Sequence, residues 1–158
     1  MAKRNVEGAH IPAVGEGKRG EQGAIGYLLR QAQTVHRQAM ERALSASGLT
    51  LPQFSVLTML AAYPGASGAD LARLSMLTPQ TVSVIVANLE RMGAIARTPH
   101  AAHGRVLQIV VTLLGQDLLN RCKASVRRID QALLAELSVE EEATIRRWLV
   151  RVAAGAED

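Results

Sequence analysis

The chain has 158 residues, a length that favours a single domain, and 48% of them are hydrophobic, which is enough for a core. Its formal net charge of +4 suits a nucleic-acid partner without requiring one. The single cysteine excludes an intrachain disulfide and a cysteine-rich metal site, and no hydrophobic run approaches the roughly 18 residues of a membrane span.

Residues 1–22 are rich in glycine and charge and show no hydrophobic period, so we predict a flexible N-terminal arm. The remainder, residues 23–158, is predicted to form one domain. From Ala24 onward hydrophobic residues recur at helical spacing. This pattern predicts a long helix that ends near Ser47, with Gly48 as its C-cap.

Three shorter helices are predicted next, and each begins at a capping signature. The signatures are Thr50 with Gln53, Ser67 with Asp70, and Thr78 followed by Pro79. The sequence "YPG" at 63–65 ends the first of these helices, and a tight turn over 75–77 separates the second from the third. Gly93 ends the third helix.

Two β-rich segments, "AIARTP" and "VLQIVVT", flank "HAAHG" and predict a small hairpin. A second long helix begins at Leu113, and a last helix begins at a capping signature formed by Ser138 and Glu141. The predicted fold is therefore mainly α with a small β-hairpin wing. Two short helices joined by a tight turn and followed by a hairpin are typical of a winged helix-turn-helix.

The predicted helix after Thr78 has two contrasting faces. The face expected to meet the core carries Val82, Ile85, Val86, Leu89 and Met92. The opposite face carries Gln80, Val84, Ala87 and Arg91, with Thr81 and Ser83 beside them. Short uncharged side chains of this kind allow close approach to a major groove, where glutamine bonds adenine edges and valine meets a thymine methyl group. The alternative is an ordinary surface helix of an alanine-rich protein.

The segments "GLTLPQFSVLTML", "GADLARLSMLTPQTVSVIVANLERMGAI" and "VVTLLGQDLL" resemble the MarR (multiple antibiotic resistance regulator) family over about residues 26–152. The resemblance implies a homodimeric winged-helix transcription factor. Residues 49–112 would form the DNA-binding lobe, and residues 23–48 and 113–158 the dimerisation helices. The helix face and the resemblance together predict DNA contacts from Ser67, Thr78, Gln80, Thr81, Ser83, Val84, Asn88, Arg91, Arg97, His103 and Arg105.

The wing departs from the family pattern, which is roughly Asp-x-x-Asp-Arg-Arg. This chain has "HAAHGR", so Arg105 fills the second arginine position and His100 and His103 replace the aspartates. We expect Arg105 to enter a minor groove and His103 to contact phosphate when protonated. Two histidines without a nearby cysteine or carboxylate form a poor zinc site, so no metal is expected.

By the same resemblance, a small-molecule effector would bind between the dimer helices and the DNA-binding lobe. The candidate residues there are His36, Arg37, Met40, Met59 and Tyr63. The alternative is that Met40 and Met59 fill the core and that Arg37 is a surface charge. Aromatic acids, phenols, coenzyme A thioesters and antibiotics are all compatible effectors. Cys122 is expected to be a buried small hydrophobic residue and not a thiol sensor.

The predicted function is a ligand-responsive repressor that binds a pseudo-palindromic double-stranded DNA operator as a homodimer. No phosphate loop, metal-binding spacing or nucleophile motif suggests an enzyme, and no cofactor is expected. The second hypothesis is a winged-helix module that binds protein, as an anti-repressor does, and does not read DNA. With no hydrophobic stretch after Lys3 and Arg4 to form a secretory signal, the expected location is cytoplasmic, without membrane association.

Overall fold

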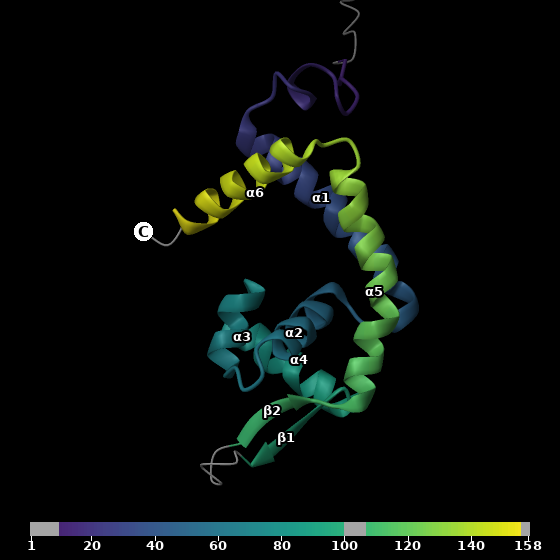
Figure 1. The fold of residues 1–158 in the computed structure, drawn as a ribbon, viewed down its shortest axis with the longest axis vertical. Coiled ribbons are helices and arrows are strands. Elements are labelled where there is room, and N and C mark those ends of the chain that lie inside the picture. Colours follow the sequence, from purple (N-terminus) through teal and green to yellow (C-terminus); the bar gives the residue numbers. More distant parts are fainter. Residues whose placement is uncertain (1–9, 100–106, 156–158) are drawn as a thin grey trace, which may run out of the picture. The chain divides into compact units, whose positions relative to one another are not determined.

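The computed structural model describes residues 10–99 and 107–155, as six α-helices, two short 3-10 helices and two strands (Figure 1). The α-helices are α1 (Ile25–Leu44), α2 (Leu51–Ala62), α3 (Gly68–Ser75), α4 (Pro79–Arg91), α5 (Leu113–Leu134) and α6 (Val139–Ala154). Two compact units divide between Gln38 and Ala39, inside α1. The predicted order and the predicted fold class are confirmed.

The first unit contains a 3-10 helix (Gly17–Arg19) and most of α1. The Arg19 guanidinium donates to the carbonyl of Pro12 at 2.9 Å, and the Gln31 amide donates to the carbonyl of Arg19 at 3.2 Å. Part of the segment predicted as an arm is therefore folded into turns that are tied to α1. Its flexibility stays a prediction.

The core of the second unit lies among α2, α3, α4, the hairpin and the first half of α5. Its fully buried side chains are mostly leucine, isoleucine and valine, and the largest are Leu44, Leu57, Leu60, Leu71, Leu89, Ile95, Val56 and Val82. Helix α2 contacts α3, α4, β2 and α5, so it is the centre of this lobe. Figure 1 shows the short helices α2, α3 and α4 gathered above the hairpin.

The capping signatures place the helix starts as predicted. Thr50 with Gln53, Ser67 with Asp70, and Ser138 with Glu141 each form a complete capping box. At α4 the Thr78 hydroxyl accepts the backbone N–H of Thr81 at 3.2 Å, and Pro79 occupies the first helical turn. These bonds satisfy backbone donors that a helix start otherwise leaves open.

The turn between α3 and α4 depends on Met76, which has a left-handed backbone (φ 54°) and a side chain that is 91% exposed. Its backbone N–H donates to the carbonyl of Arg73, and the N–H of Leu77 donates to that of Ala72. A non-glycine residue in this conformation is uncommon. The sequence predicted the turn but gave no sign that Met76 would carry the positive φ.

The wing is an antiparallel pair of β1 (Ile95–Pro99) and β2 (Leu107–Val111), with Ile95 opposite Val111 and Arg97 opposite Ile109. Both predicted strands are confirmed. The tip of the wing, including His100, His103 and Arg105, lies outside the described residues.

A tight junction, which we call the Thr112 joint, connects the end of α4, the base of the wing and the start of α5. Thr112 donates from its N–H to the carbonyl of Ala94 at 3.0 Å and from its hydroxyl to that of Gly93 at 2.6 Å. The same hydroxyl accepts the N–H of Gly115 at 3.1 Å. A Cβ on Gly115 would overlap the Ala94 carbonyl oxygen and lie 2.9 Å from Val111 Cγ1, so the first turn of α5 needs glycine here.

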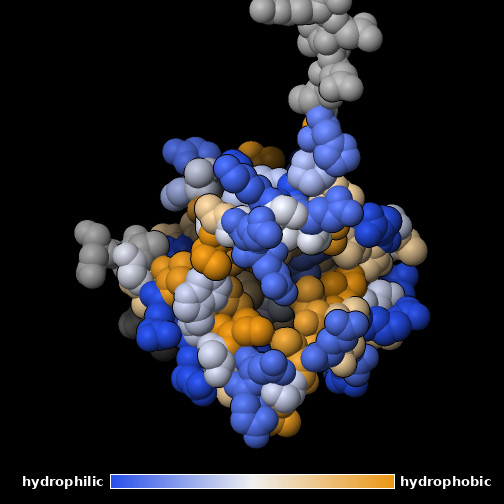
Figure 2. Space-filling model, turned by 90° about the horizontal axis from the view of Figure 1, so that it is seen from above, coloured by the Kyte–Doolittle hydropathy of each residue, from blue (hydrophilic) through white to orange (hydrophobic). Residues whose placement is uncertain are grey.

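Helix α5 buries Leu118 and Cys122, which agrees with the expectation that Cys122 is a small hydrophobic core residue. Helix α6 buries no residue, although Ile145, Leu149 and Val152 share one side of it. In the space-filling view, hydrophobic side chains reach the surface in several places among hydrophilic ones (Figure 2). The side chains of this hydrophobic stripe of α6 remain 39–46% exposed.

Within the described residues, no single helix is long and hydrophobic enough to cross a membrane. Residues 25–47 and 51–62 pass that test only as a pair bent by 80°. Several of their hydrophobic side chains, among them Leu44, Leu57 and Leu60, belong to the core of the lobe.

Candidate nucleic-acid interface

Helix α4 presents two chemically distinct faces. Val82, Ile85, Val86 and Leu89 are buried, as predicted, and fix the helix to the lobe. Met92 was predicted on the same face, but it is 38% exposed because the helix ends at Arg91 and Met92 is the C-cap. The prediction was therefore wrong for Met92.

The outward face of α4 has the composition that the sequence predicted. Its exposed side chains are Gln80, Thr81, Ser83, Val84, Ala87 and Arg91. Val84 is 62% exposed although water is an unfavourable neighbour for it. Asn88 is half-buried, so it lies at the edge of this face. A surface that is polar and largely uncharged, with one valine, matches the edges of bases better than it matches bulk water.

The start of α4 has little capacity left for phosphate. Thr78 and Thr81 share a hydroxyl–hydroxyl bond of 2.8 Å, and the Thr78 hydroxyl also accepts the N–H of Thr81. The N–H of Val82 already donates to the Thr78 carbonyl, and Pro79 has none. In the described part of the chain, the Gln80 N–H is therefore the backbone donor of this first turn that remains for an anion, and whichever of the two threonine hydroxyls accepts in their shared bond keeps its own proton to donate.

Ser67, at the start of α3, has a hydroxyl that is already engaged. It accepts the N–H of Asp70 at 3.1 Å and donates to the Asp70 carboxylate at 2.6 Å. Hydrogen bonds from the Ser67 hydroxyl and backbone N–H, with one from Arg73, hold the pKa of Asp70 at about 2. Because the Ser67 hydroxyl is engaged with Asp70 in this cap, little of its hydrogen-bonding capacity remains for a phosphate.

Arg97, on β1, pairs with Glu90 of α4 at 3.3 Å and thereby ties the wing to α4. It lines a hollow of about 390 Å³ together with Ser83 and Ile109, between α4, the start of α3 and the wing. The structure therefore brings Ser83 and Arg97 together. Sequence reasoning missed the role of Glu90, for which no pattern in the chain gave a signal.

The candidate effector residues divide between the two units. His36 and Arg37 belong to the first unit, and Met40, Met59 and Tyr63 to the second. Met40 is 5% exposed and Met59 packs against the core, so both fit the core-filling alternative. Whether the five residues form one pocket stays a prediction.

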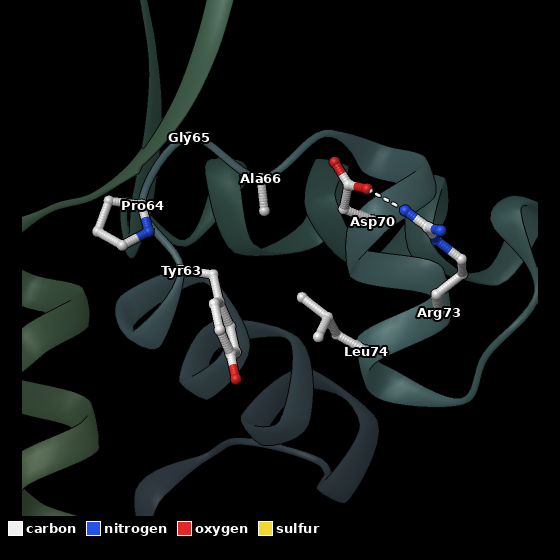
Figure 3. A pocket seen from close by; sticks show the side chains of 7 residues that line it. All are labelled: Tyr63, Pro64, Gly65, Ala66, Asp70, Arg73 and Leu74. Atoms are coloured by element: carbon white, nitrogen blue, oxygen red, sulfur yellow. Dashed lines mark hydrogen bonds and ion pairs between the residues drawn. The ribbon is translucent and has the colours of Figure 1, made fainter. Parts of the chain in front are cut away.

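Tyr63 is 54% exposed and lines an open hollow of about 590 Å³ with Asp70, Arg73 and Leu74. Figure 3 shows the Tyr63 ring and the Leu74 side chain facing this space, with the ion pair of Asp70 and Arg73 at its far side. Because each charge in that pair already has a partner, the hollow offers no unpaired charge among these residues to bind an ion.

Sequence reasoning also missed a groove between α2 and α5, to which Thr58, Lys123 and Arg127 contribute. The spacing of Lys123 and Arg127, four residues apart on a predicted helix, was the available signal. Among the residues that the structure describes, no three histidine, cysteine or acidic side chains come together as metal ligands.

Comparison with known proteins gives a consistent result. The model of the MarR family matches residues 47–106. A transcriptional repressor of Mycobacterium tuberculosis, Rv2887, is 39% identical over 128 residues, which cover 81% of this chain and 92% of the repressor. The crystal structure of Rv2887 with salicylic acid aligns with a TM-score of 0.66 at 38% identity, covering 84% of this chain and 98% of that one. The structure of Rv2887 with DNA aligns with a TM-score of 0.64 at 36% identity, covering 82% and 97%.

Proposed function

The chain belongs to the MarR family, and from this membership we propose that it is a ligand-responsive, DNA-binding transcriptional repressor. As a homodimer it would place two α4 helices in successive major grooves, about 34 Å apart, on a pseudo-palindromic operator. A small effector would shift the dimer to a conformation that does not fit this spacing.

The observation that carries the proposal is the outward face of α4. Gln80, Ser83 and Val84 are exposed on a helix whose other face is fixed by four buried side chains. A rigid helix with short side chains can approach base edges closely, whereas a helix with long charged side chains would be held at the phosphates. The relative Rv2887 has been crystallised with DNA, which supports the same use of this lobe.

The effector is a small organic anion or phenol in this proposal, and a coenzyme A thioester remains a candidate. Support comes from the complex of Rv2887 with salicylic acid. His36, Arg37, Met40, Met59 and Tyr63 are its first candidate contacts, with Arg37 to pair an anionic group.

Dimerisation would use residues 23–48 and 113–158, with residues 49–112 as the DNA-binding lobe. The exposed hydrophobic stripe of α6 supports this division, because a second copy would cover it. Neither catalysis nor a cofactor is part of the proposal, and the protein would act in the cytoplasm.

The decisive experiment compares Gln80→Ala with Arg105→Ala by fluorescence anisotropy on operator and scrambled duplexes over a salt series. Gln80→Ala should weaken operator binding by about 1–3 kcal/mol and relax the preference at one position per half-site. Binding to the scrambled duplex should barely change, since glutamine carries no charge. Arg105→Ala should weaken both duplexes and flatten the salt slope by about two units per dimer.

Equal weakening of both duplexes by Gln80→Ala, with base preference intact, would show that α4 does not read sequence. The protein-binding hypothesis, in which the lobe docks on another protein as an anti-repressor does, would then move ahead.

A further inference from the structure

Met76, in the turn between α3 and α4, has a backbone conformation that suits glycine better than methionine. Its φ is 54°, in the left-handed region where a side chain is strained. Among the residues that the structure describes, five others have a positive φ, and all five are glycines, including Gly48 and Gly93 at helix ends. A glycine at position 76 would therefore relieve strain in the turn.

The side chain of Met76 contributes little to the core. It is 91% exposed, whereas Leu77, the next residue, packs against the core of the lobe. Backbone bonds hold the turn, from the N–H of Met76 to the carbonyl of Arg73 and from the N–H of Leu77 to that of Ala72. Any residue except proline can donate the first of these bonds. Neither the turn nor the core therefore requires a methionine at this position.

The position of Met76 along the chain is the second observation. Thr78, the N-cap of α4, follows two residues later, and the exposed outward face of α4 begins there. No charged residue occurs between Arg73 and Glu90, and Arg73 is itself in an ion pair within α3. The uncharged exposed surface of α4 therefore continues into the turn that carries Met76.

The way a helix-turn-helix docks on DNA gives this exposed side chain a neighbour. The second helix enters the major groove with its N-terminal residues at the base edges, and the first helix crosses the phosphate backbone. The turn that joins them therefore passes the edge of the groove. A methionine side chain is unbranched, flexible and hydrophobic. The hydrophobic group that base pairs present in the major groove is the methyl group of thymine.

From these observations we propose that Met76 is a specificity-determining residue that packs on the methyl group of a thymine at the edge of each half-site. The inference rests on the proposed DNA-binding function and adds a contact to those expected from α4 and the wing. Val84 is expected to meet a thymine methyl group as well. It lies about 9 Å along the helix axis from Thr78, so the two residues would meet different base pairs.

The test uses duplexes that the full-length wild-type protein selects from a random DNA library. Each thymine of the selected half-site is replaced in turn, in both half-sites, by deoxyuridine, which lacks only the methyl group. At the thymine that Met76 contacts, wild-type affinity in fluorescence anisotropy should fall about fifteenfold, which is about fourfold for each buried methyl group.

Two substitutions of Met76 should remove this response. Met76→Gly should bind the selected duplex at least tenfold more weakly than wild type, and deoxyuridine at that thymine should then have no further effect. Its melting temperature should equal or exceed that of wild type, because glycine relieves the strain. Met76→Gln keeps the length of the side chain and the strained backbone but loses the hydrophobic contact, so it should also ignore the methyl group.

Two other variants are the controls. Leu113→Gln removes a side chain that is 92% exposed, at the start of α5, and should respond to deoxyuridine as wild type does. Val84→Ala should reduce the deoxyuridine effect at a different thymine and leave the effect at the Met76 thymine unchanged. Circular dichroism of each variant separates misfolding from lost contacts, and Met76→Gln decides the question if Met76→Gly is misfolded.

Three results would overturn the inference: wild-type affinity that no deoxyuridine changes, a full methyl effect at every thymine in Met76→Gly and Met76→Gln, or equal weakening of selected and scrambled duplexes by these variants. The last result would place the contact on sugar or phosphate. In all three cases the wild-type protein still selects a DNA sequence, so the proposed function stands. If the wild-type protein enriches no sequence from the library, the proposed function fails and the inference fails with it.

Discussion

Helices α4 and α6 are both amphipathic, but they differ in how much of their hydrophobic face is buried within the chain. Helix α4 buries four hydrophobic residues against the lobe, whereas α6 buries none. The exposed face of α4 is polar and largely uncharged, and the exposed surface of α6 includes a hydrophobic stripe beside Arg146, Arg147 and Arg151.

The difference separates two kinds of exposed surface. The hydrophobic face of α4 is buried within one chain. Its outward face is therefore not needed to stabilise the fold and is available for DNA. The hydrophobic face of α6 is not fully buried within the chain. Exposing hydrophobic surface to water is unfavourable by roughly 25 cal/mol for each Å². We therefore expect the hydrophobic face of α4 to be buried in a monomer and that of α6 to be buried only in a dimer.

The largest effect is expected from a variant that places negative charge on the hydrophobic stripe of α6. The double variant Leu149→Glu with Val152→Glu should abolish the dimer, because a buried unpaired carboxylate costs several kcal/mol. Sedimentation at micromolar concentration should give the 16.9 kDa chain mass in place of twice that value.

The matched control is Val150→Glu, which places the same charge on α6 about 100° away from Leu149. It should leave the dimer intact. A double variant that still sediments as a dimer would remove α6 from the interface.

A second variant tests how tightly the lobe is packed at the Thr112 joint. Gly115→Ala adds a methyl group where the Ala94 carbonyl and Val111 leave no space, so it should destabilise the lobe by about 1–3 kcal/mol or more. It should also disturb the Thr112 joint and reduce operator affinity.

The control for the joint is Gly68→Ala, since a Cβ on Gly68 has no neighbour within 4 Å. Urea unfolding of both variants gives the comparison. If Gly115→Ala unfolds at the wild-type urea concentration, the joint is looser than its hydrogen bonds indicate.

Local patterns in the sequence predicted most of the lobe. The capping boxes at Thr50 and Ser67, the turn after Ser75 and the buried face of α4 depend on residues within a few positions of one another. Such signals are physical constraints on the backbone, and they were sufficient for the fold class, whereas the family was identified from the resemblance of three longer segments.

Contacts between distant segments were not predictable in the same way. The bond from Thr112 to Gly93 spans 19 residues, and Thr58 becomes an unpaired buried hydroxyl only because α5 packs beside α2. The groove between α2 and α5 was missed for this reason. Burial of Met40 and Met59 likewise depends on packing that a helical period cannot specify.

The smallest expected effect is the pH-dependent stability that the capping boxes of α3 and α6 contribute. Asp70 in the lobe has its pKa lowered to about 2, from a usual 3.8, chiefly by the Ser67 hydroxyl and backbone N–H. The backbone N–H of Ser138 similarly lowers the pKa of Glu141 at the start of α6. The box at Thr50 uses the neutral Gln53.

A lowered pKa gives stability that is present above the unfolded pKa and is lost as pH falls through the folded pKa. For Asp70 that window runs from about 4 down to about 2. The difference in unfolding free energy between wild type and Asp70→Asn should therefore be constant near neutral pH and shrink below pH 4. Gln53→Ala should show a difference that does not depend on pH in this range.

The same comparison in the monomeric double variant separates the lobe from α6. The Asp70 effect should persist there, because α3 packs on a core within one chain. The effect of Glu141→Gln should vanish, since a 16-residue helix without tertiary contacts is only marginally stable in water. Urea titrations between pH 3 and 6 measure both differences. A Glu141 effect that survives in the monomer would mean that α6 is stable without its partner, and the contrast between the two regions would not hold.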